Sequence, residues 1–89
     1  MFYCFLADGF EETEALAPVD ILRRAGIAVK TVGVGGGVIR GSHNIYVTAD
    51  VEISELGDLS DAEGIILPGG MPGVKNLFAD ENVRNAVSY

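Results

Sequence analysis

The sequence is poor in residues that stabilise a fold or a site through sulfur or a metal. Its 89 residues contain one cysteine, one histidine and no tryptophan. One cysteine cannot close an internal disulfide, and one cysteine with one histidine cannot make a structural zinc site. This cysteine usage is typical of a reducing compartment, so we expect a cytoplasmic protein without a metal.

Basic residues are also scarce, with six lysines and arginines against thirteen acidic residues and a net charge of −7. Nucleic acids and anionic membranes both attract basic surfaces, so neither is expected as a partner. The apolar N-terminus stops at Asp8 without a basic region before it, which argues against a signal peptide. No apolar run approaches the ~18 residues of a membrane span.

The apolar and amphipathic segments of the first half of the sequence predict a parallel α/β fold. Residues 1–7 are apolar without alternation, as in a strand buried on both faces. Residues 11–25 begin with glutamates, end with Arg23 and Arg24, and have apolar residues at helical spacing. Residues 27–34 are rich in β-branched side chains and predict a second strand. This order predicts a right-handed unit with two parallel strands.

The middle of the chain is less regular. Residues 38–40 and 44–49 predict a small hairpin, whereas residues 50–63 are acidic and without periodicity. A third buried strand is expected at residues 64–67. Residues 71–78 predict a turn that leads towards a helix.

Asp80 is a suitable N-cap for a last helix, which has no stop signal before Tyr89. We therefore expect residues 1–89 to be the N-terminal part of one domain, cut within a helix. Three strands with so few helices would leave open sheet edges, which a C-terminal half or another partner would cover.

Two loops are candidates for a ligand crevice, because ligands of open α/β sheets bind at the carboxyl ends of the strands. They are residues 8–11 and the glycine-rich residues 68–73. Backbone N–H groups near Gly69 and Gly70 could hold an oxyanion, and the alternative is a plain turn. Asp8 could serve as a phosphoacceptor, but no second acidic residue lies directly beside it.

The glutamates that follow the first loop have two interpretations. Glu11 and Glu14 share a helix face, and a carboxyl beside a buried crevice can stay protonated and donate a hydrogen bond. The alternative is that they only complement the helix dipole, which we prefer for Glu11 and Glu12. Glu14, in the second turn, is the better candidate for a site.

The nucleophiles of the chain do not form a site by themselves. Cys4 lies within the first strand among aromatic residues and reads as a core residue. His43 lies in a predicted turn, where a solvated side chain is expected. No serine, histidine and acid form a credible triad.

Two motifs about 40 residues apart, FLADGFEETEALAPVDILRRAGI and GIILPGGMPGVKNL, resemble the ThiJ/PfpI family. The family includes a parkinsonism-linked protein deglycase and small bacterial ThiJ-like members. The resemblance runs through the whole chain. It implies a flavodoxin-like α/β fold, related to the class I glutamine amidotransferases, with a parallel sheet, helices on both faces and about twice this length.

The resemblance also implies roles for individual residues. Members are usually dimers with a nucleophilic cysteine on a strand-to-helix elbow, which would lie beyond residue 89. Matching positions imply that Glu14 hydrogen-bonds this cysteine and that Gly70, with Gly69 before it, supplies a backbone N–H to the oxyanion hole. The positions implied at the dimer interface are Glu11, Asp20, Arg24 and His43, the last in a loop near the partner's active site.

The function implied is that of a cysteine-dependent hydrolase-type protein without a cofactor. Its substrate would be a small electrophile or a glycated group, in deglycase, glyoxalase, amidase or peptidase chemistry. Older assignments of the small members name a thiazole monophosphate step of thiamine biosynthesis. The alternative is a non-catalytic redox-sensing or chaperone-like stress protein that uses the same cysteine.

Overall fold

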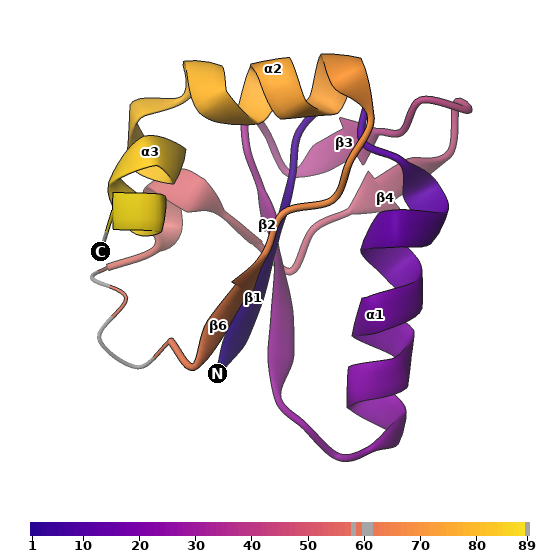
Figure 1. Cartoon of the computed structure of the whole chain (residues 1–89), viewed down its shortest axis with the longest axis vertical. Helices are drawn as coiled ribbons and strands as arrows, with labels where there is room; N and C mark the ends of the chain where they lie inside the picture. The colour runs from indigo at the N-terminus through magenta and orange to yellow at the C-terminus, as the bar shows by residue number, and fades with distance from the viewer. Residues whose placement is uncertain (58, 60–61, 89) are drawn as a thin grey trace.

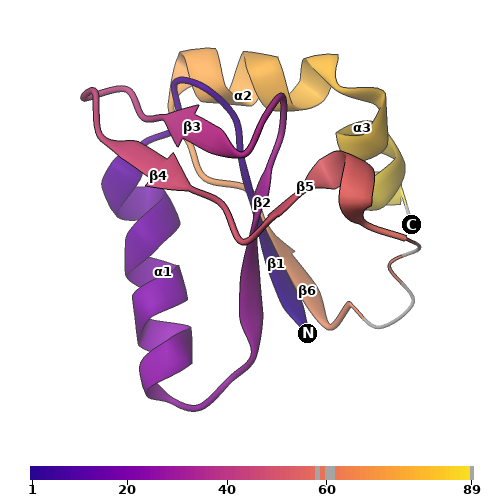
Figure 2. The same ribbon diagram turned by 180° about the vertical axis from the view of Figure 1, so that it is seen from behind.

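The core of the fold is a parallel sheet whose strands are arranged in the order β5-β2-β1-β6 (Figures 1 and 2). The computed structural model describes residues 1–57, 59 and 62–88. The strands are β1 (Phe2–Leu6), β2 (Val29–Gly33), β5 (Val51–Glu52) and β6 (Gly64–Ile66). The predicted α/β class with parallel strands is therefore confirmed.

The strand β1 lies between two partners and is the most buried part of the chain. Phe2 pairs with Val29 on one side and with Gly64 on the other, both in parallel register. Cys4 is fully buried, as predicted from its apolar neighbours. In contrast, β6 is only half-buried along its length, because among the described residues it pairs with β1 alone.

The helix α1 (Glu12–Arg24) covers one face of the sheet, and its ends agree with the prediction to within one residue. Glu11 is the N-cap, and its carboxylate accepts the N–H of Glu14 at 2.8 Å. Apolar residues of this face form one cluster with the helix: Cys4, Leu6, Phe10, Ala15, Val19, Val29 and Ile39.

The helices α2 (Met71–Ala79) and α3 (Glu81–Ser88) cover the opposite face, so helices lie on both faces as predicted. Leu77 of α2 and Val83 of α3 pack in one cluster with Phe5. The Asp80 carboxylate accepts the N–H of Asn82 at 2.8 Å, which confirms its predicted capping role. The Ala86 side chain and Tyr89 lie outside the described residues.

The hairpin of β3 (Val38–Arg40) and β4 (Tyr46–Thr48) is antiparallel and forms a separate sheet (Figure 2). Its position was predicted correctly. Ile39 points into the same cluster as α1. The hairpin thus covers the α1 side of the sheet beside the start of that helix.

Two expectations were wrong. The segment 50–63 contains β5 and a 3-10 turn, η1 (Ile53–Glu55), in addition to irregular chain. Asp50 fixes the chain at the edge of β2 just before this strand, since its carboxylate accepts the Thr31 N–H at 2.9 Å and its own N–H donates to the Thr31 hydroxyl. Residues 58, 60 and 61 of this segment lie outside the described part.

The other error concerns residues 71–78, which are helical from Met71 onwards. Gly70 lies at φ 98° and lets the backbone turn directly from the loop into α2. Pro72 is tolerated because the N–H groups of the first turn have no partner within the helix. None of the helices among the described residues is long and apolar enough to cross a membrane.

We expect Gly73→Ala to destabilise the fold, because a Cβ atom at this position would lie 2.8 Å from the backbone N and Cα of Phe10. These backbone atoms cannot move independently, so the expected cost is about 1–3 kcal/mol. Urea unfolding measures it. Gly57→Ala is the matched control, since nothing lies within 4 Å of its Cβ position. Equal midpoints for the two variants would contradict this packing.

Candidate functional site

The loops after β1 and β6 meet at the carboxyl ends of these strands, where the sequence predicts a ligand crevice. These parallel strands are neighbours, and the chain places β2 on one side of β1 and β6 on the other, so strand order reverses here. The Glu11 N–H donates to the Gly69 carbonyl at 3.0 Å. The Asn76 amide of α2 donates to the Asp8 carbonyl at 2.7 Å. The two loops are therefore joined by a backbone hydrogen bond, and a side-chain hydrogen bond ties α2 to the first of them.

Glycines make this close approach possible. A Cβ atom on Gly70 would lie 2.7 Å from the Gly9 carbonyl oxygen, and one on Gly9 would lie 2.6 Å from the Pro72 Cβ. Both glycines have positive φ angles, of 98° and 89°. Within the described part of the chain, the Gly70 N–H donates no hydrogen bond. The glycine loop is thus more than a simple turn, because it packs directly on the start of α1.

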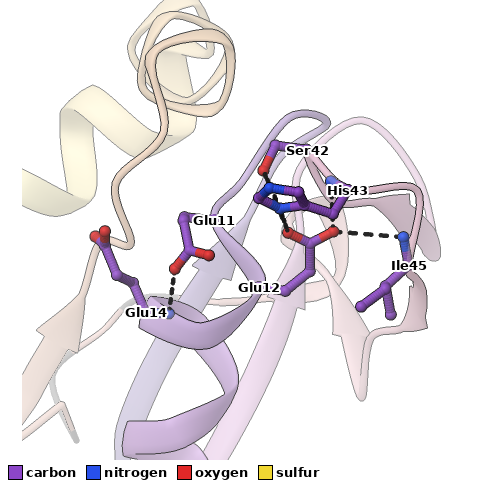
Figure 3. Close-up of polar contacts among 6 residues, drawn as sticks. All are labelled: Glu11, Glu12, Glu14, Ser42, His43 and Ile45. Carbon is purple, nitrogen blue, oxygen red and sulfur yellow. Dashed lines mark hydrogen bonds and ion pairs between the residues drawn. The ribbon is translucent and has the colours of Figure 1, made fainter.

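Glu14 and Gly69 are brought together across the crevice. The exposed Glu14 carboxylate accepts the Gly69 N–H at 2.9 Å. Figure 3 shows its side chain pointing towards the loop before α2, on the side of the helix away from Glu12. The predicted neighbourhood of Glu14 and the glycine loop is confirmed, and their predicted chemical roles remain predictions.

Glu12 contradicts our interpretation of it as a partner of the helix dipole alone. It is 5% exposed, and its carboxylate accepts the His43 N–H at 2.7 Å and the Ile45 N–H at 3.4 Å. It is also 3.0 Å from the His43 Nδ1 and 3.2 Å from the Ser42 hydroxyl (Figure 3). We call Glu12 and its contacts with residues 42–45 the Glu12 clasp.

The sequence contains a signal that identifies Glu12, although it was missed. Glu12, Ala15 and Val19 are the buried residues of α1, and their spacing of three and four places them on one helix face. A charged residue in such an apolar series needs a compensating partner. Gly41 makes room for it, since a Cβ atom there would lie 2.3 Å from the Glu12 carboxylate.

The clasp changes the acidity of both of its titratable groups. Burial alone would raise the pKa of Glu12, but hydrogen bonds from the His43 side chain and from backbone N–H groups outweigh it and lower that pKa to about 2. The hydrogen bond and charge of Glu12 raise the pKa of His43 above its ordinary value, with a smaller contribution from Glu11. The His43 side chain is exposed, as predicted, and it also pairs with Glu12 when it is protonated, which the sequence did not indicate.

One group among the described residues has ligand atoms close enough together to share a metal ion, namely Glu11, Glu12 and His43, within 4.8 Å of one another. However, Glu12 already accepts hydrogen bonds from the hairpin loop, and Glu11 caps α1. Hydrogen bonding within the fold thus accounts for this group. The expected absence of a cofactor remains a prediction.

The remaining candidates do not contact Glu14 or Gly69. Asp20 and Arg24 are exposed on α1 and pair with each other at 3.2 Å. Cys4 is fully buried, and burial raises the pKa of its thiol to about 11, so it lacks the properties of a reactive cysteine. Asp8 lines an open depression of about 310 Å³, and its carboxylate accepts the Arg40 N–H.

Comparison with known proteins identifies relatives of this chain. The model of the DJ-1/PfpI family matches residues 2–89. The chain belongs to the DJ-1/PfpI family. The flavodoxin-like fold implied by the two sequence motifs is also confirmed, because solved structures of this family superpose on nearly the whole chain.

Three relatives illustrate the similarity. The zebrafish Parkinson disease protein 7 homolog is 34% identical over 83 residues, which are 92% of this chain and 44% of the relative. A mutant of a DJ-1 superfamily protein from Salmonella typhimurium is 37% identical with a TM-score of 0.88, over 98% of this chain and 47% of that one. A deglycase of Thermococcus kodakarensis is 33% identical over 64 residues, which are 72% of this chain and 38% of the relative. This DJ-1/PfpI chain therefore spans less than half the length of each.

The Glu12 clasp predicts a specific acid sensitivity. Because the folded pKa of about 2 lies below the ordinary value of 4.5, Glu12 contributes stability above pH 4.5 that is lost as the pH falls towards 2. We expect Glu12→Gln to lower the urea midpoint at pH 6 and to flatten the fall of stability between pH 5 and pH 2. Glu81→Gln, at an exposed position of α3, is the control and should retain the steep fall. Parallel curves for all three proteins would contradict the assignment.

Proposed function

We propose that this DJ-1/PfpI chain forms one half of the active site of a cysteine-dependent hydrolase-type protein. The observation that carries the proposal is the 2.9 Å hydrogen bond from the Gly69 N–H to the Glu14 carboxylate, next to the Gly70 N–H, which has no acceptor among the described residues. The similarity to a deglycase supports chemistry on carbonyl-derived or glycated groups. The nucleophilic thiol would come from the C-terminal half of the same protein.

The proposed chemistry needs three groups around one electrophilic carbon. A thiolate attacks the carbon, and the charge that develops on its oxygen is stabilised by the Gly70 N–H. In its protonated form, Glu14 donates a hydrogen bond to the thiolate and holds it in place. The oxyanion then re-forms the carbonyl and expels the amine or alcohol leaving group, which takes a proton from solvent, and water hydrolyses the resulting thioester to a carboxylic acid and the free thiol. A rigid loop is required, because an oxyanion donor acts only when it is aimed before the reaction begins. The packing of Gly70 on Gly9 supplies that rigidity.

The edge of the sheet supports the proposal that residues 1–89 are the N-terminal part of one domain. Among the described residues, β6 pairs only with β1, so its other edge offers backbone groups to a further strand. A C-terminal half that adds this strand would place its own strand end beside the Gly69 loop. The crevice and the open edge are thus on the side where the second half of the site is needed.

We expect Glu14→Leu to raise the pKa of the catalytic thiol by about one unit in the complete polypeptide that contains these residues. Loss of a hydrogen bond to a thiolate disfavours it, and one unit corresponds to a tenfold smaller thiolate fraction. Glu14→Gln retains a hydrogen-bond donor and should show a smaller change. The rate of iodoacetamide alkylation against pH measures both, with the modified cysteine located by mass spectrometry.

Glu81→Leu is the control for this experiment, because it changes an exposed glutamate outside the crevice. If the alkylation profile of Glu14→Leu matches that of the control, the role of Glu14 is wrong. Release of product from a glycated peptide or from methylglyoxal supports the hydrolase-type function. Oxidation of the same cysteine to a stable sulfinate without turnover would instead support the redox-sensing alternative.

We also propose that the complete protein is a homodimer whose interface includes Asp20 and Arg24 of α1, its N-cap Glu11, and His43 of the hairpin loop. Asp20 and Arg24 are exposed and oppositely charged, so a second copy could exchange their pairing. Asp20→Lys should shift the complete protein towards the monomer in sedimentation velocity experiments. Lys30→Glu, at an exposed position of β2, is the charge-reversed control. A dimer that is unaffected by Asp20→Lys would contradict this interface.

A further inference from the structure

The Glu12 clasp connects the hairpin loop to the same backbone that forms the crevice. Besides the contacts with Glu12, the Ser42 N–H donates to the Phe10 carbonyl at 2.8 Å. The next residue, Glu11, donates its N–H to the Gly69 carbonyl on the opposite side. The backbone of residues 10–12 is therefore held by the hairpin loop on one side and by the glycine loop on the other.

We propose that the protonation state of His43 regulates the candidate site by tightening or loosening the Glu12 clasp. This inference names a regulation of the proposed site, so its functional meaning rests on the proposed function. The clasp itself, and its coupling to the Gly69 loop, can be tested without any activity.

The clasp contains one titratable donor among donors that do not titrate. The backbone N–H groups of His43 and Ile45 and the Ser42 hydroxyl contact Glu12 at any pH near neutrality. In the single chain the His43 imidazole is 73% exposed, so it can exchange a proton with solvent there, and its Nδ1 lies 3.0 Å from the buried carboxylate. The charges that shift its titration are those of Glu12, in the first turn of α1, and of Glu11, the N-cap of that helix.

The direction of the regulation follows from the sign of the shift. Because Glu12 raises the pKa of His43, the ion pair stabilises the closed clasp at pH values below the ordinary pKa of 6.5. This contribution is lost as the pH rises through the folded pKa of His43. Above the folded pKa of His43, the clasp keeps the hydrogen bonds from its uncharged donors. It loses the positive charge of His43, which compensates the negative charges of Glu12 and of the neighbouring Glu11. We therefore expect a tighter hairpin loop in acid and a looser one in alkali.

The experiment uses the fact that His43 is the only histidine of the chain, so that its titration gives one set of NMR signals. The amide of Ile45 should exchange with solvent about two- to fivefold faster above the His43 pKa, after correction for intrinsic exchange, as expected for a largely exposed ion pair. The amide shift of Gly69 should change with the same midpoint. Failure of the Gly69 signal to follow His43 overturns the coupling.

Two variants separate the clasp from general effects of pH. His43→Gln keeps a polar side chain at an exposed position and should remove both pH-dependent changes while the chain stays folded. Glu12→Gln should move the pKa of His43 back towards 6.5. If Ile45 exchange keeps its pH dependence in His43→Gln, another group is responsible and the proposal is wrong.

The outcomes distinguish this inference from the proposed function. If Gly69 follows His43 but Glu14→Leu leaves the thiol of the complete protein unchanged, the clasp is established and the proposed function fails. If the thiol responds to Glu14→Leu but its alkylation rate keeps the same pH profile in His43→Gln, the regulation fails while the function stands. A profile that loses one inflection in His43→Gln supports both.

Discussion

The arrangement of the candidate site depends on the backbone of residues 8–12 being held between two other loops. On one side, the absence of side chains on Gly70 and Gly73 lets the loop before α2 and the first turn of that helix pack directly on this backbone. On the other side, the buried carboxylate of Glu12 accepts the N–H groups of the hairpin loop. If either contact were lost, this backbone would be held from one side only, and the position of Glu14 relative to the Gly69 loop would be less well fixed.

Burial of Glu12 is tolerated because its charge is almost completely compensated. An isolated buried carboxylate is strongly disfavoured, whereas one that accepts several N–H and O–H donors can remain ionised. The direction of the shift, to a pKa of about 2, agrees with this interpretation, since the hydrogen bonds outweigh the effect of burial. The same hydrogen bonds order the hairpin loop, where Asn44 takes a positive φ of 63°. The Glu12 carboxylate therefore fixes the conformation of the hairpin loop, and the loop in return supplies the donors that compensate its charge.

The sequence was sufficient for features that depend on neighbours along the chain. The ends of α1, the hairpin and the Asp80 cap were predicted because local periodicity and capping residues determine them. The sequence was insufficient for features that depend on a contact with a residue far away along the chain. Pairing of β5 depends on Asp50 reaching β2, and the burial of Glu12 depends on a loop about 30 residues away. The spacing of Glu12 with Ala15 and Val19 places it on the buried face of α1, but this local pattern does not show that its partner on that face is the hairpin loop.

The geometry of one helical turn explains why three glutamates have three different positions. Successive residues of a helix are rotated by about 100°, so Glu12 and Glu14 point roughly 200° apart, to opposite sides of α1. Glu12 thus reaches the hairpin and Glu14 reaches the Gly69 loop, while Glu11 precedes the helix and caps it (Figure 3). The residue at which the helix starts, Glu12, determines all three of these side-chain directions. A change in the clasp that shifts this first turn must therefore also move the Glu14 carboxylate relative to the glycine loop.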